Sequence, residues 1–212
     1  MKKVLVTCSA LLLVASIGML AQDNINLNQG SETEYLAVTR TPHGANPAGC
    51  VGFYDNICGA GYNGGIGWKV NDRPPVELSP AMQFTASKSG TSSEITLGLT
   101  YVTGTNAAVG ILTEDCGGAP CTDPDGQPED RQLCAGKVSN MPKFGSTHTI
   151  TVTFDCRAQI SRGQKYWVFL QSLENSGLAW NHSNSATGHM YEGKNDSWVN
   201  FGTEHLSALT VQ

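Results

Sequence analysis

The sequence has little charge, and its acidic side chains outnumber its basic ones. Charged residues make up 15% of the chain, with 13 Lys and Arg against 18 Asp and Glu. Proteins that bind nucleic acid need a positive surface that releases counterions, and anionic lipids likewise attract basic segments. The composition therefore excludes nucleic acid as an expected partner, and it excludes a charge-driven hold on a membrane.

The sequence also lacks the short motifs that mark common catalytic and metal sites. It contains no C-x-x-C pair, no G-x-S-x-G elbow and no Gly-rich phosphate loop. These absences exclude a dithiol redox centre, a zinc module and the α/β-hydrolase arrangement. The distance between the two carboxylates of a glycosidase is fixed by the fold and leaves no spacing pattern in the sequence. A glycan-active hydrolase is therefore kept as the least favoured alternative. We expect no enzyme.

No segment shows a sustained 3.6-residue apolar period, which argues against long helices. Strand patterns are frequent instead. Apolar residues alternate with threonine and glycine in Ile95–Tyr101, Ala107–Ile111 and Ile150–Phe154, and Gly104-Thr105-Asn106 predicts a hairpin turn between the first two. The continuous apolar run Tyr166–Leu170 predicts a central strand buried on both faces. The fold prediction is an all-β, antiparallel β-sandwich, jelly-roll-like and stapled by disulfides.

One long hydrophobic run is present, at the start of the chain. Lys2 and Lys3 precede the apolar segment Val4–Leu20, and Ala21 follows it. The run is shorter than the roughly 20 residues of a membrane span, and Cys8 lies too early for a lipoprotein signal. The pattern predicts a cleaved secretory signal peptide, and hence a protein of the extracellular space or periplasm with no stable membrane insertion.

Cleavage would leave about 190 residues with a net charge near −7, enough for one domain with its own core. The segment after the signal peptide is polar and rich in Gly and Pro, and we expect one short strand in it, near Tyr35–Thr39. The predicted organisation is a signal peptide over residues 1–21, a polar tail or linker over 22–48, and a β-sandwich domain over 49–212.

Six cysteines remain once Cys8 has been removed, and an even number in an exported protein predicts disulfides. They are Cys50, Cys58, Cys116, Cys121, Cys134 and Cys156. Six cysteines allow 15 connectivities, and the sequence alone does not choose among them. Proximity in the chain favours Cys50–Cys58 and Cys116–Cys121. Cys134 and Cys156 remain, each on a predicted strand, and form the third expected pair.

Acidic side chains gather in one loop that also contains three prolines. They are Asp115, Asp123, Asp125, Glu129 and Asp130. Calcium takes six to eight oxygen ligands, which clustered carboxylates and loop carbonyls supply. A solvated acidic turn that binds no metal explains the same residues and is the favoured interpretation. We expect no cofactor, with calcium as the alternative.

Two tryptophans lie among polar residues and are the candidate ligand-binding side chains. Trp180 precedes Asn181 and His182, and Trp198 follows the polar run Asn195-Asp196-Ser197. Exposed rings beside amide and hydroxyl groups stack on sugars, whereas buried rings would close the ends of the core. The core interpretation is favoured, and the sugar-binding one remains open.

Several short motifs along most of the mature chain resemble a β-sandwich domain of secreted environmental bacteria. They are Tyr54-Asp55-Asn56, Gly67–Val70, Gln83-Phe84-Thr85, Tyr101–Asn106, Glu114–Pro120, Ser139–Gly145, Gly163–Val168 and Trp180. In these motifs the chain resembles the "choice-of-anchor" type and related uncharacterised exported proteins. The resemblance implies an extracellular β-sandwich with no established activity. Such domains often have a Pro-Gly turn where this chain has Pro120-Cys121, which supports a local Cys116–Cys121 bridge.

These observations lead to two main functional expectations. The first is a secreted, non-catalytic module with a structural or interaction role. The second is a carbohydrate-binding module, with calcium as an auxiliary ligand. The expected partner is accordingly a polysaccharide or another extracellular protein.

Overall fold

The computed structural model of the chain describes residues 34–36, 52–58, 61–71, 77–121, 131–194 and 197–212. These residues form 13 strands and no helix, so the all-β prediction is confirmed. None of the described segments is a helix long and apolar enough to cross a membrane. The predicted signal peptide lies outside the described residues, as does the tail apart from residues 34–36.

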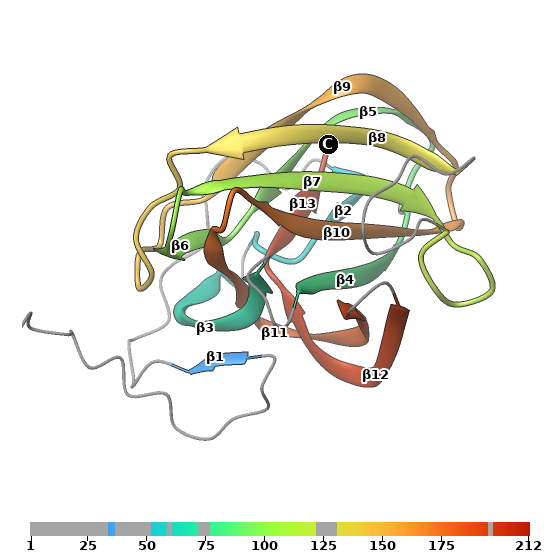
Figure 1. The fold of residues 1–212 in the computed structure, drawn as a ribbon. Coiled ribbons are helices and arrows are strands. Elements are labelled where there is room, and N and C mark those ends of the chain that lie inside the picture. The colour runs from blue at the N-terminus through green and yellow to red at the C-terminus, as the bar shows by residue number, and fades with distance from the viewer. Residues whose placement is uncertain (1–33, 37–51, 59–60, 72–76, 122–130, 195–196) are drawn as a thin grey trace, which may run out of the picture.

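Nine of the strands form a large sheet in the order β1-β3-β11-β4-β10-β7-β8, with β6 and β12 also pairing with β11. Figure 1 shows β8, β7, β10 and β4 side by side. The bounds are β1 (Glu34–Leu36), β3 (Tyr62–Asn71), β4 (Leu78–Thr85), β6 (Leu99–Thr103), β7 (Ala107–Glu114), β8 (Gln132–Ser139), β10 (Lys165–Leu173), β11 (Gly177–Lys194) and β12 (Ser197–Ser207).

The other four strands form a small sheet in the order β2-β13-β5-β9. Their bounds are β2 (Tyr54–Asp55), β5 (Gly90–Leu97), β9 (Ile150–Ile160) and β13 (Leu209–Val211). One main core unites the two sheets. It contains Ile95 and Val152 of the small sheet together with Met82 and Val168 of the large sheet. The two sheets therefore bury their apolar faces in a common interior.

Strand β10 is central and buried on both faces, as its continuous apolar sequence predicts. It lies between β4 and β7. Tyr166, Val168 and Leu170 belong to the main core, whereas Trp167 and Phe169 point the other way into a second cluster. Alternation along a strand sends successive side chains to opposite faces, so the large sheet needs apolar residues on both.

The predicted hairpin is wrong in its pairing, although both of its strands exist. The turn residues adopt left-handed backbone, with φ of 89° at Gly104 and 63° at Asn106. However, β6 pairs with β11, and β7 pairs with β8 and β10. The alternating run Ile95–Tyr101 leaves the small sheet at Gly98 and continues in the large one. A local pattern identifies strands but not the distant partners that compete for their edges.

Two of the three predicted disulfides lie within the described residues and are confirmed. Cys116–Cys121 closes a turn, and Cys134–Cys156 joins β8 of the large sheet to β9 of the small one. Cys58 is also disulfide-bonded. Cys50, its predicted partner, lies outside the described residues. Disulfides persist in oxidising surroundings, so these bonds indicate a non-reducing compartment.

Candidate functional site

A polar surface pocket of about 470 Å³ lies at one end of the molecule, and we call it the end pocket. It is formed where β7 ends and where the turn from β9 to β10 passes from the small sheet to the large one. Its lining residues are Glu114, Asp115, Ser161, Gly163, Gln164, Lys165 and Tyr166.

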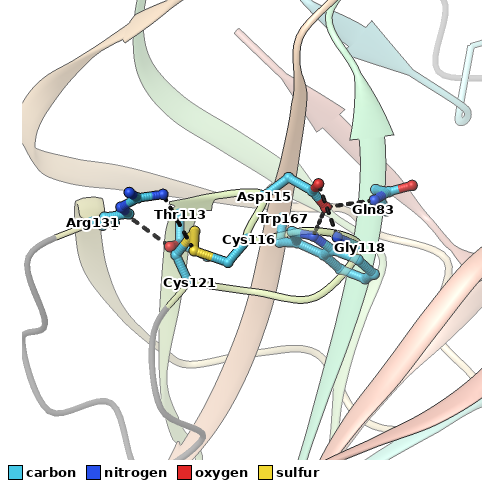
Figure 2. Close-up of a disulfide and its surroundings, with 8 residues drawn as sticks. All are labelled: Gln83, Thr113, Asp115, Cys116, Gly118, Cys121, Arg131 and Trp167. Carbon is cyan, nitrogen blue, oxygen red and sulfur yellow. Dashed lines mark hydrogen bonds between the residues drawn. A yellow bond between two sulfur atoms is a disulfide. The ribbon is translucent and has the colours of Figure 1, made fainter.

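Asp115 fixes one wall of the end pocket through three hydrogen bonds, which Figure 2 shows. Its Oδ1 accepts from Gln83 Nε2 and from Trp167 Nε1, each at 2.7 Å, and its Oδ2 accepts from the backbone N–H of Gly118 at 3.1 Å. The carboxylate thereby satisfies the indole N–H of a fully buried tryptophan. Asp115 ties a loop to the face of the large sheet.

The turn after Asp115 is stabilised by a glycine with a positive φ and by a disulfide. Gly118 has φ of 102°, a conformation that side chains with a Cβ rarely adopt. The Cys116–Cys121 bond closes the loop, and the N–H of Cys116 donates to the carbonyl of Ala119 at 2.8 Å. Arg131 also places Nη1 3.5 Å from Cys116 Sγ. The wall that carries Asp115 is therefore rigid.

The opposite wall is the turn from Ser161 to Tyr166. The N–H of Gln164 donates to the carbonyl of Ser161 at 3.1 Å, and the N–H of Ser161 donates to the Tyr166 hydroxyl at 2.9 Å. Two further backbone bonds tie Gly163 and Gln164 to Ala86, just after β4. Both walls of the end pocket are thus fixed to the large sheet.

The end pocket offers hydrogen-bonding groups of both kinds. Its lining includes two acidic residues, Glu114 and Asp115, together with Lys165 and Gln164. Glu114 and Lys165 are exposed, and neither side chain has an ion-pair partner in the described part of the chain. The lining contains no histidine and no cysteine. This arrangement suits binding of a small polar molecule.

The structure places the sequence-predicted residues around Trp180 in the interior. Trp180 and Asn181 are 0% exposed and His182 is 4% exposed. The Trp180 Nε1–H donates to the carbonyl of Ala208 at 3.0 Å, and His182 stacks on His205 with ring centroids 5.6 Å apart. A sugar stacks only on an open ring face. Trp180 is therefore a core residue and provides no stacking platform.

Trp198 is half-buried and packs edge-on against Phe169, with ring centroids 5.3 Å apart. Trp198 borders the second cluster, whereas Trp180 belongs to the main core. The two tryptophans predicted as ligand-binding residues therefore do not form a joint surface.

The candidate metal ligands are placed only in part. Asp115 is described and bonds to protein donors, whereas Asp123, Asp125, Glu129 and Asp130 lie outside the described residues. Among the residues that the structure describes, one group has metal-ligand spacing, and it consists of Cys134, Asp155 and Cys156. Its two cysteines share a disulfide and so supply no thiolate. The calcium alternative stays a prediction.

Sequence reasoning missed a buried carboxyl group on β11. Glu192 is 0% exposed, and neither carboxyl oxygen has a hydrogen-bond partner. Burial raises the pKa of Glu192 to about 8, against smaller lowering effects of Lys194 and Lys69. One signal was present in the sequence: on a strand, Glu192 shares a face with the core residue Met190.

Comparison with known proteins gives no relative: no family model matches the chain, and neither a curated protein nor a solved structure does. The resemblance to exported "choice-of-anchor"-type domains therefore stays a prediction.

Proposed function

We propose that the protein is an exported, disulfide-stabilised β-domain of the extracellular space or periplasm that acts by binding and not by catalysis. The observation that carries the binding role is the end pocket, a polar hollow whose walls are held by hydrogen bonds to the large sheet. The disulfides support export, because such bonds are rare in reducing compartments.

The finer description of the fold is part of the same proposal. We assign the two sheets to an antiparallel sandwich of the jelly-roll type. A common core and antiparallel pairing of all the named strands support this assignment.

A hydrolase is less well supported than a binding module. The end pocket does contain two carboxylates, Glu114 and Asp115. However, Asp115 accepts three protein hydrogen bonds, and Glu114 is exposed to solvent. Glycosidases place their general acid in an apolar setting that keeps it protonated. The two carboxylates are better suited to accept hydrogen bonds from a ligand.

Export is tested by expressing the tagged full chain and a variant without residues 2–21 in a bacterium and measuring where each accumulates. The full chain should leave the cytoplasm, lose its N-terminal segment and show all six remaining cysteines oxidised by non-reducing mass spectrometry. The shortened variant should stay inside with free thiols. Retention of the full chain, or two or more free thiols in the exported protein, would contradict the proposal.

Carbohydrate binding is the second candidate function, with calcium as an auxiliary ligand. It is favoured by the polar residues that line the end pocket. A glycan-binding screen with and without a calcium chelator tests it. Binding that disappears with chelator supports calcium assistance, whereas no binding to any polysaccharide under either condition would contradict carbohydrate binding.

A further inference from the structure

We propose that the end of the β11–β12 hairpin is a strap that opens locally from the large sheet in response to pH, and that ionisation of Glu192 drives the opening. The strap consists of residues 190–194 of β11 and 197–200 of β12. This inference goes beyond the binding role and does not depend on it, because it concerns how one part of the large sheet is held in place.

The strap lies at an edge of the large sheet, and Figure 1 shows β12 at the margin of the molecule. On one side, residues 190–194 pair with residues 78–82 of β4. On the other side β11 pairs with β12, which pairs with no further strand among those described. Strand β10 is held from both sides by β4 and β7, so the strap should open more readily than β10 does.

Two aromatic contacts fasten the strap to β10 on the outer face of the sheet. Tyr191 packs edge-on against Trp167 with ring centroids 5.1 Å apart, and Trp198 packs in the same way against Phe169 at 5.3 Å. Tyr191 and Trp198 are half-buried, whereas Trp167 and Phe169 are 0% exposed. The closed strap therefore covers two buried rings of the second cluster.

Glu192 lies on the other face of the strap and acts against these contacts. Its side chain is 0% exposed, and neither carboxyl oxygen has a hydrogen-bond partner. The residues opposite it are Pro80 on β4 and Val199 on β12, whose side chains donate no hydrogen bond, and Pro80 lacks a backbone N–H as well. An ionised carboxyl group is costly to bury without partners, and opening of the strap returns it to water.

The charged residues around Glu192 do not offset its burial. Burial raises the pKa of Glu192 by more than Lys194 on its own strand and Lys69 on β3 lower it. Strand β4 contains no charged residue. Glu204 and His205 of β12 pair with residues 188 and 187, several positions away from Glu192.

The closed strap holds Glu192 as the neutral acid, whereas the open strap lets it ionise. The pKa is about 8 in the closed state against an ordinary value of 4.5 in water. Between these values each opening event releases a proton, so the opening constant should rise about tenfold for each pH unit. The closed strap is most stable below about pH 4.5, and this stability is lost as the pH rises to about 8.

Amide hydrogen exchange of the intact, oxidised protein tests this opening, measured by NMR at about pH 5 and pH 7 with and without a low concentration of urea. Protection factors divide out the intrinsic pH dependence of exchange, and those of the strap should fall about 70-fold from pH 5 to 7. Local opening exposes little surface, so urea should hardly change exchange in the strap. Amides of β10, which exchange through global unfolding, should exchange faster in urea.

Two substitutions at position 192 and one control identify the responsible group. Glu192→Gln cannot ionise, so the protection factors of its strap should be equal at the two pH values. Glu192→Met, apolar like the neighbouring Met82 and Met190, gives the same test if glutamine impairs folding. Glu204→Gln removes an exposed carboxyl group of β12 and should keep the 70-fold change of the parent. Circular dichroism confirms that each variant is folded.

Equal protection of the strap at both pH values in the parent protein would overturn the proposal. Strap amides that lose protection only together with those of β10, and with the same dependence on urea, would show that Glu192 reaches water only through global unfolding and would contradict local opening. A pH effect that persists in the variants without a carboxyl group at position 192 would overturn the assignment to Glu192.

Discussion

Replacement of Glu192 by glutamine should remove a large pH dependence from the stability of the fold. The side chain lies on β11, with Pro80 of β4 opposite it on one side and Val199 of β12 on the other. Its carboxyl oxygens are buried without hydrogen-bond partners, and the lysines whose charges reach it are Lys194 and Lys69. A carboxyl group in such a place is more stable as the neutral acid.

The magnitude follows from the difference in pKa between the folded and unfolded states. The pKa of Glu192 is about 8 in the fold against an ordinary value of 4.5. Between these values the folded protein keeps a proton that the unfolded chain loses, so stability falls as pH rises. The slope is about 1.4 kcal/mol per pH unit, which makes a loss of about 5 kcal/mol between pH 4.5 and 8.

Glutamine resembles the protonated acid in shape and does not ionise. The free energy of unfolding of Glu192→Gln should equal that of the parent near pH 4.5. It should exceed the parent value by about 3 kcal/mol at pH 7 and by about 5 kcal/mol above pH 8. Other titrating groups affect both proteins equally and cancel in the difference.

The measurement is urea unfolding at about pH 5, 7 and 9, followed by tryptophan fluorescence. Trp68, Trp167 and Trp180 are buried and report on the core. Glu204→Gln, an exposed substitution on the adjacent strand β12, is the control and should show no such trend. If the difference between Glu192→Gln and the parent changes by less than about 1 kcal/mol from pH 5 to 9, the reasoning is refuted.

Three further substitutions test the packing. Tyr62→Phe removes a buried hydroxyl that has no hydrogen-bond partner, so chemical denaturation should show unchanged stability or a gain of up to about 1 kcal/mol; a loss of 2 kcal/mol would reveal a hidden partner. Joint replacement of Cys134 and Cys156 by alanine opens a loop with a sequence separation of 22 and should cost about 3.4 kcal/mol, and an unchanged melting temperature would contradict this. Gly98→Ala puts a Cβ 2.8 Å from the Cβ of Ala208 and 2.9 Å from the Tyr62 ring and should cost about 1–3 kcal/mol, and unchanged stability would contradict this.

The strands could be predicted from the sequence because the alternation of side chains is a local property. Ile150–Phe154 and Tyr166–Leu170 both lie in strands, and the second run is buried on both faces as expected. The Cys116–Cys121 disulfide followed from a short separation in the chain, whereas Cys134–Cys156, with a separation of 22, was the pair that remained. For the strands and for Cys116–Cys121, the information lies within a few residues of the feature.

The pairing of strands and the candidate site could not be predicted in this way. β6 and β7 are joined by a short turn yet pair with different strands, because β11 and β10 compete for their edges. The end pocket combines Glu114 and Asp115 with Ser161–Tyr166, two segments that meet only when β7 and β10 pair. A site built from distant segments leaves no spacing pattern in the sequence.

The residues after Trp180 are polar, as residues on an exposed surface usually are, yet they lie in the interior. Two strands leave one sheet for the other, at Gly98 and at Ala208, and a strand that changes sheets loses its regular hydrogen-bonding partners. Here Asn181 donates its N–H to the carbonyl of Gly98 and accepts from the N–H of Ala208, each at 2.7 Å, while Gly98 donates to Ala208 at 3.1 Å.

Side chains also form hydrogen bonds at this place, where two strands pass from one sheet to the other. Asn56 donates from Nδ2 to the carbonyl of Ser207 and accepts at Oδ1 from the N–H of Leu209, each at 2.8 Å. Thr100 donates to the Asn181 Oδ1 at 3.2 Å. Buried backbone groups are costly when unpaired, so a place where strands change sheets requires polar side chains inside the protein. Polar side chains therefore lie beside the core residue Trp180. They are polar because they pair with backbone groups where the strands change sheets, and not because they are exposed.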